Sequence, residues 1–146
     1  MRVFLDTNII LDHALDRRQC FADEATRILG WCATGLLDGF ISAASVYTLT
    51  YVLERAGYRN DALRQKLQAY LSWVSPLATD ALVFKNAFDS KFADLEDAYQ
   101  YYTAAYAKMN YFISGNLRDF KTDKPIDRVV VLNPADFVRQ MSFLDL

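Results

Sequence analysis

Acidic residues stand at several points where a buried element of this chain should end or begin. The first is in the segment VFLDTN at residues 3–8, where three apolar residues run directly into Asp6 and Asn8. A short apolar run that ends in polar residues is typical of a buried strand in a parallel sheet. Ligands of open α/β sheets bind at the carboxyl ends of such strands. Asp6 is therefore placed for chemistry, although Asp and Asn are equally suited to capping the helix that follows.

Three more acidic positions have the same character. Glu54 follows apolar residues in an expected helix, and Asp119 follows an expected strand. Asp97 lies in the first turn of another expected helix, just after Asp94. Each also has a purely structural explanation, as the partner of a nearby arginine, as a carboxylate at the positive end of a helix, or as a turn residue.

These carboxylates are expected to converge, because the carboxyl ends of parallel strands gather on one edge of a sheet. Carboxylates that lie close together repel one another and are driven towards protonation. A divalent cation with hard oxygen ligands, Mg²⁺ or Mn²⁺, relieves that repulsion. The acidic positions together therefore predict a metal site better than any one of them alone.

The elements that must position these side chains alternate between short apolar strands and amphipathic helices. Strands are expected at residues 3–5, 40–43, 74–77, 111–114 and 129–132, the third at an edge because it contains Pro76. Helices are expected at residues 9–15, 21–36, 45–57, 61–71, 80–88 and 95–108, and from Pro134 onwards. This alternation predicts an α/β fold, a three-layer α/β/α sandwich with a short central parallel sheet, in a single domain over residues 1–146.

The composition is that of one globular domain, with 53% hydrophobic and 23% charged residues in a chain of 146. A net charge of −2 argues against a strongly basic nucleic-acid binder, but not against an acidic site that holds metal cations. The single histidine, His13, makes a Ser-His-Asp enzyme improbable. Two cysteines without metal-site spacing and the lack of a membrane-length apolar run predict a cytoplasmic protein.

The motifs resemble those of the PIN domain family, and most closely the bacterial toxins of VapC-type toxin–antitoxin pairs. The segments that carry the resemblance are, in chain order, LDTNI at residues 5–9, Glu54 on the helix introduced by Ser45, EDA at residues 96–98 and ISGNLRDF at residues 113–120. They cover essentially the whole chain. The chain has Ser114 where the family usually has Thr, and Asn116 where many members have Asp. The last acidic role is therefore assigned to Asp119.

This resemblance implies a metal-dependent endoribonuclease that hydrolyses RNA phosphodiester bonds, with one or two Mg²⁺ or Mn²⁺ ions. The residues implied as catalytic acids and metal ligands are Asp6, Glu54, Asp97 and Asp119, and those implied to support them are Asn8, Asp94, Ser114 and Asn116. The resemblance also implies a homodimer and an antitoxin protein that blocks the acidic pocket. The chemistry agrees, because metal ions held by carboxylates activate water and stabilise the charge that develops during phosphodiester hydrolysis.

Two other functions compete with this interpretation. A non-catalytic RNA- or protein-binding domain of the same fold is one, although a binder of a polyanion gains nothing from clustered carboxylates. A Mg²⁺-dependent phosphatase of the Asp-x-Asp type is the other, and it also begins with a strand followed by Asp-Thr. In this chain Asn8 replaces the second Asp of that motif. Neither a P-loop nor a dinucleotide-binding glycine motif occurs.

Overall fold

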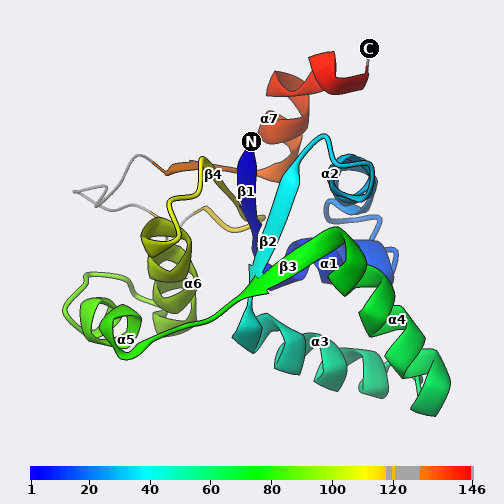
Figure 1. Ribbon diagram of the computed structural model, residues 1–146, viewed down its shortest axis with the longest axis horizontal. Coiled ribbons are helices and arrows are strands. Elements are labelled where there is room, and N and C mark those ends of the chain that lie inside the picture. Colours follow the sequence, from blue (N-terminus) through cyan, green and yellow to red (C-terminus); the bar gives the residue numbers. More distant parts are fainter. Residues whose placement is uncertain (118–119, 121–128, 146) are drawn as a thin grey trace.

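The protein is described here by a computed structural model that covers residues 1–117, 120 and 129–145. Within these residues a single parallel sheet has the strand order β3-β2-β1-β4-β5 (Figure 1). The strands are β1 (Arg2–Leu5), β2 (Asp38–Ser42), β3 (Val74–Leu77), β4 (Tyr111–Ile113) and β5 (Val130–Leu132). The helices are α1 (Thr7–Ala14), α2 (Ala22–Ala33), α3 (Ala43–Arg55), α4 (Asn60–Trp73), α5 (Ala81–Phe88), α6 (Leu95–Tyr106) and α7 (Pro134–Gln140), followed by the 3₁₀ turn η2 (Ser142–Asp145).

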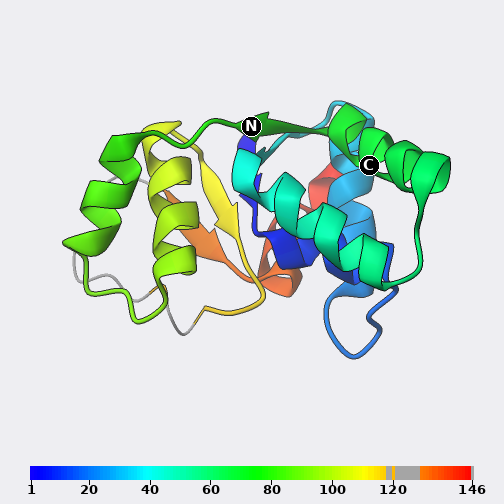
Figure 2. The same cartoon turned by 90° about the horizontal axis from the view of Figure 1, so that it is seen from below.

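The central strand β1 separates two hydrophobic cores. Val3 and Leu5 belong to a core shared with α1, α2, α4 and α7, whereas Phe4 belongs to a core formed with α5 and α6. Successive residues of a strand point to opposite faces of the sheet, so an uninterrupted apolar strand is suited to being covered on both sides. Figure 2 shows α5 and α6 on one side of the sheet and the other helices opposite. The predicted three-layer α/β/α fold with a parallel sheet is confirmed.

Close contact between α2 and the sheet depends on a glycine. The apolar stripe of α2 includes Ala25, Ile28 and Cys32, which recur at helical spacing and are buried. Cys32 packs directly over Gly39 of β2, where an added Cβ atom would lie 2.6 Å from the Cys32 Sγ and 2.8 Å from Cγ1 of Val74. Gly39 therefore allows α2 to approach the sheet more closely than any other residue would.

Capping residues define where several helices begin. Asp80 and Asp94 cap α5 and α6, and Asn133 caps α7 with Pro134 in its first turn. The start of α3 differs from the sequence prediction, which placed Ser45 at the opening of the helix. The N-cap is Ser42, whose Oγ accepts the Ser45 N–H at 3.1 Å. Ser45 is thus inside the first turn, where its side chain is buried.

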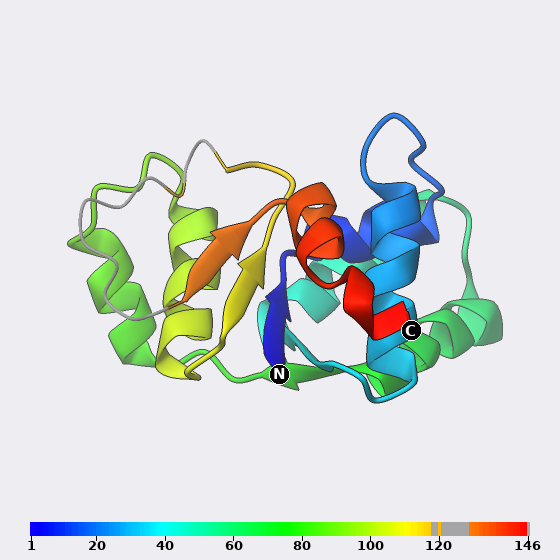
Figure 3. The ribbon, with the colours of Figure 1, turned by 90° about the horizontal axis from the view of Figure 1, so that it is seen from above.

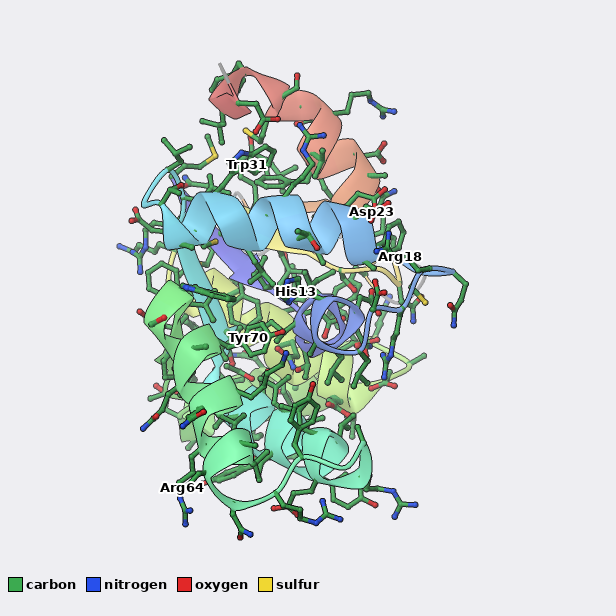
Figure 4. All side chains as sticks on the ribbon, turned by 90° about the vertical axis from the view of Figure 1, so that its right-hand side faces the viewer. His13, Arg18, Asp23, Trp31, Arg64 and Tyr70 are labelled. Atoms are coloured by element: carbon green, nitrogen blue, oxygen red, sulfur yellow. The ribbon has the colours of Figure 1, made fainter. Side chains whose placement is uncertain are left out.

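His13 links α1 to α4. Its Nδ1 atom is 2.6 Å from the Tyr70 hydroxyl oxygen (Figure 4). Its ring lies edge-to-face with those of Tyr70 and Trp73. Partial burial lowers the pKa of His13, and the positive charge of Lys66 lowers it further.

None of the helices in the described ranges is long and apolar enough to cross a bilayer.

Candidate active site at the carboxyl edge of the sheet

Asp6 lies where β1 ends and α1 begins, beside the end of β4. Its N–H donates to the Ile113 carbonyl at 3.0 Å, and its carboxylate accepts a hydrogen bond from the Ser114 Oγ at 2.9 Å. Figure 3 shows β1, β4 and β5 side by side in the sheet. Asp6 occupies the N-cap position of α1, yet its side chain makes no capping hydrogen bond. The well-formed hydrogen bond of this carboxylate is made with Ser114 and not with the first turn of α1, although the Thr7 and Asn8 N–H groups lie close enough to act on it.

The Asp6 carboxylate is buried and forms no ion pair with a basic residue in the part of the chain that the structure describes. Asp6 is 8% exposed, and the ion pairs between described residues do not include it. Burial raises the pKa of Asp6, and the negative charge of Glu96 raises it further. The Ser114 hydroxyl and the backbone N–H groups of Thr7 and Asn8 oppose this rise but do not cancel it. A carboxylate in these surroundings would be stabilised by a bound cation.

The first turn of α6 brings further acidic residues to this edge. Asp94 caps the helix by accepting the backbone N–H groups of Glu96 at 2.9 Å and Asp97 at 3.2 Å. Glu96 acts electrostatically on Asp6, and half-buried Asp97 follows it in the same turn. One turn later, the Gln100 Nε2 atom donates to the Thr7 Oγ1 at 3.2 Å, which ties α6 to the start of α1. Asp94 itself thus has the structural role of a cap.

A buried polar network joins three helices next to Asp6. The Thr7 and Ser45 hydroxyl oxygens lie 2.7 Å apart, and the Ser45 hydroxyl lies 2.9 Å from that of Ser42. Gln100 adds a longer contact, 3.4 Å from its Nε2 to the Ser45 Oγ. Among the described residues the Gln100 Oε1 atom has no hydrogen-bond partner. The network fixes α1, α3 and α6 relative to one another at the sheet edge.

Sequence reasoning did not identify Ser42, Ser45 or Gln100 as members of such a network, and it quoted Glu96 without giving it a role. A signal for Gln100 was available, because it lies one turn after Glu96 and Asp97 and on the same side of the helix. A cavity of about 80 Å³ adjoins the network. Its lining comes from the start of α3, from Thr79 and Phe84, and from the α6 residues Glu96, Tyr99, Gln100 and Thr103.

Glu54 does not reach this part of the molecule. It is exposed in the last turn of α3, where the carbonyl of Glu54 accepts a hydrogen bond from Arg59. The helix begins at the site, since Ser45 contacts Thr7, and Glu54 lies nine positions after Ser45. At a rise of 1.5 Å per residue this separation is about 14 Å along the axis. The prediction that Glu54 joins Asp6 in one ligand set is therefore corrected.

The remaining candidate residues are Asn116, Asn8 and Asp119, and each lies in a different kind of position. Asn116 supports Ser114 by donating its backbone N–H to the Ser114 Oγ at 3.2 Å. Asn8 is exposed in the first turn of α1. Asp119 lies outside the described residues, so its role as an acid stays a prediction.

The described side chains offer the kind of donor atoms that a divalent cation prefers, but too few of them are grouped together to hold one. Over residues 1–117, 120 and 129–145, no three His, Cys, Asp or Glu side chains are grouped closely enough to hold a metal ion. The donors at the site are nevertheless all hard oxygen atoms, from Asp6, Glu96 and Asp97, which are the kind that Mg²⁺ and Mn²⁺ prefer. The raised pKa of Asp6 is the observation that favours a cation here.

Comparison with known proteins agrees with the fold. A family model described as a PIN domain matches residues 2–118, so the chain belongs to the PIN domain family. A similar solved structure is the crystal structure of VapBC2 from Rickettsia felis bound to a DNA fragment from their promoter. The TM-score is 0.68 at 15% identity, over 91% of this chain and 98% of the other. No curated protein matched the sequence.

Proposed function

We propose that this protein is a metal-dependent endoribonuclease, with a site built around Asp6 at the carboxyl edge of the sheet. The observation that carries the proposal is the buried Asp6 carboxylate, held by Ser114 and lying within the electrostatic influence of Glu96. Membership of the PIN domain family supports it, because PIN domains are generally nucleases. A protein that only binds RNA gains nothing from a buried carboxylate such as Asp6, because the RNA backbone is itself negatively charged.

The proposed ligands are Asp6, Asp97 and Glu96, with Asp119 as a further acid. Bound Mg²⁺ or Mn²⁺ would lower the pKa of a water molecule and stabilise the charge that develops on the phosphate. The Ser114 hydroxyl fixes the orientation of the Asp6 carboxylate through its 2.9 Å hydrogen bond.

Two contacts hold the acids of α6 in place. Asp94 caps the helix, and Gln100 binds the Thr7 hydroxyl one turn beyond Glu96 and Asp97. The protein atoms around the site are therefore fixed before the RNA arrives, which is what electrostatic stabilisation of a transition state requires.

The same proposal includes a biological setting, that of a toxin controlled by an antitoxin. The similar solved structure contains VapBC2 from Rickettsia felis together with promoter DNA. By analogy, we propose a cytoplasmic toxin that forms a homodimer and whose site is blocked by an antitoxin protein.

The decisive experiment compares RNA cleavage by five purified proteins: the wild type and the variants Asp6→Asn, Asp97→Asn, Glu96→Gln and Glu54→Gln. Each is incubated with structured and single-stranded RNAs in Mg²⁺, in Mn²⁺ and in EDTA. We expect cleavage by the wild type only when metal is present, and none by Asp6→Asn or Asp97→Asn. Glu54→Gln is the matched control and should retain wild-type activity, because Glu54 lies at the far end of α3.

Glu96→Gln should reduce activity, since it removes a carboxylate that acts on Asp6. Parallel purification of the inactive variants excludes a contaminating ribonuclease, and circular dichroism establishes that each variant is folded. Undiminished metal-dependent cleavage by Asp6→Asn would remove this carboxylate from the mechanism. Absence of cleavage by folded, inhibitor-free wild type would favour a binding domain instead.

A further inference from the structure

The outer face of α3 carries a row of aromatic and basic side chains that the fold does not use. We call Tyr47, Tyr51 and Arg55 the α3 stripe. Tyr47 is 81% exposed and Tyr51 is 60% exposed. Residues four apart lie on the same side of a helix, so the three side chains follow one another along it. The buried residues of α3 are Ser45, Leu49 and Leu53, and the tyrosines therefore contribute little to the core.

The stripe is continuous with the candidate active site. Ala44, one turn before Tyr47, lines the cavity that Glu96 also lines. From there the stripe leads away from the acidic residues towards the C-terminal end of α3. Figure 2 shows α3 on the outside of the molecule, with its first turn next to the sheet and its last turn near α4. A strand bound at the acidic residues would pass directly onto this face.

The chemistry of the stripe is suited to single-stranded nucleic acid. The Arg55 guanidinium lies over the Tyr51 ring, 5.8 Å from its centre, so a positive charge and a stacking surface occur together. Grooves for single strands combine aromatic rings, on which bases stack, with basic groups for the phosphates. Tyr and Arg are also enriched at protein interfaces, so RNA is assigned as the occupant because the stripe begins next to the candidate active site.

The spacing of Tyr47 and Tyr51 also favours single-stranded over double-stranded nucleic acid. Four residues of helix advance about 6 Å, whereas stacked bases in one strand of a duplex are about 3.4 Å apart. Successive bases can therefore meet both rings only when the strand is extended and unpaired. We propose that the α3 stripe binds the unpaired part of the RNA substrate as it leaves the site, with bases on Tyr47 and Tyr51 and a phosphate at Arg55. This inference rests on the proposed nuclease function.

Binding can be measured separately from cleavage in the Asp6→Asn protein with Mg²⁺ present. The probes are a short fluorescein-labelled single-stranded RNA and the same RNA annealed to its complement, followed by fluorescence anisotropy. We expect the single strand to bind more tightly than the duplex. Tyr47→Ala and Tyr51→Ala should each weaken its binding by about fivefold or more, because a stacked base is lost. The corresponding Phe substitutions should keep the affinity, and the Leu substitutions should not.

Arg55→Ala should weaken binding and lower the slope of log affinity against log salt by about one, as expected for one lost phosphate contact. The matched controls are Phe143→Ala and Arg139→Ala, which change an exposed aromatic and an exposed basic residue of the C-terminal segment. Figures 1 and 4 show that this segment and α3 lie at opposite ends of the molecule. The controls should bind RNA like the parent protein.

Several outcomes would overturn the inference. One is equal binding of duplex and single strand, or no binding of either by the parent protein. Another is an unchanged affinity for single-stranded RNA after both tyrosines are replaced by Ala. A third is a change in the oligomeric state of that double variant, measured by sedimentation, which would make the stripe a protein interface. Metal-dependent cleavage by the wild type would still stand in these cases. Absence of cleavage by the wild type is the separate failure of the proposed function.

Discussion

Asp6 is an acid whose surroundings oppose its ionisation. Because its pKa is raised in the folded protein, the folded state binds a proton more readily than the unfolded state, whose Asp has the ordinary value of 3.8. The free energy of unfolding therefore falls as the pH rises from 3.8 through the raised pKa. Above the raised pKa the ionised Asp6 carboxylate reduces stability, which is a common property of residues retained for function.

Replacing Asp6 by Asn should therefore stabilise the metal-free protein at pH 7. The amide has the same shape and still accepts the Ser114 hydrogen bond, but it carries no buried charge. The melting temperature should rise by about 2–4 °C for each kcal/mol gained in a chain of this size. The gain should shrink as the pH is lowered and disappear below 3.8, where the wild-type carboxyl is protonated in both states. A lower melting temperature for Asp6→Asn at pH 7 would contradict this account.

Some of the site residues could be identified from the sequence because the ends of their strands or helices can be recognised there. Asp6 directly follows an apolar run, so the end of its strand could be recognised. The position of an acid along a helix is harder to infer, because the helical period gives its side but not its distance from the sheet. For this reason Glu54 was assigned to the site although it lies at the far end of α3. Glu96 was passed over because Asp97 beside it fits the family motif better.

At the scale of elements, the contact of α2 with β2 has little tolerance for added volume. Gly39→Ala would place a Cβ atom 2.6 Å from the Cys32 Sγ and force the helix or the strand to move. We expect this substitution to lower the free energy of unfolding by about 1–3 kcal/mol, as overpacking in a core usually does. Chemical denaturation of the wild type and the variant measures the difference.

Gly30→Ala is the matched control for that experiment. Gly30 is inside α2, and an added Cβ atom would have no heavy atom within 4 Å. The same substitution there should stabilise the protein by about 0.5–1 kcal/mol, because Ala favours a helix over Gly. If both variants were destabilised to the same degree, the close approach at Gly39 would not be the cause.

The contact between α1 and α4 should make the protein sensitive to mild acid. Since the folded pKa of His13 is below its ordinary 6.5, the unfolded state binds the proton more readily. The contribution of neutral His13 to stability is therefore complete above pH 6.5 and is lost as the pH falls from 6.5 towards the folded pKa, by at most about 1.4 kcal/mol per pH unit. In His13→Gln, which does not titrate, the melting temperature should fall less steeply over this range. An unchanged slope would show that His13 does not determine it.

Most of the elements themselves could be predicted, because their signals were local and mutually consistent. Asp80, Asp94 and Asn133 each precede a helix and cap it. Pro76 correctly indicated an edge strand, since β3 is at the end of the sheet. The start of α3 was predicted wrongly because Ser42 and Ser45 are both good capping residues. The choice between them is made by a distant contact, that of Ser45 with Thr7 of α1.

For the whole molecule, a divalent cation should act as a stabilising ligand of the folded state. Mg²⁺ or Mn²⁺ would offset the repulsion at Asp6, and a ligand that binds only the folded state adds about 2.7 kcal/mol at a hundred times its dissociation constant. The melting temperature of the wild type at pH 7 should therefore rise with metal concentration and saturate. Asp6→Asn should show little change, and Glu54→Gln should respond like the wild type. A rise of equal size in Asp6→Asn would place the cation elsewhere.

The position of β1 in the middle of the sheet also bears on how the protein is made. The first strand of the chain pairs with β2 on one side and with β4 on the other. Asp6 leaves the ribosome 108 residues before Ser114, the residue that holds its carboxylate. Until β4 and Ser114 have been synthesised, one edge of β1 has no strand partner and the Asp6 carboxylate lacks the hydroxyl that holds it. A chain that is still being translated therefore carries an incomplete site.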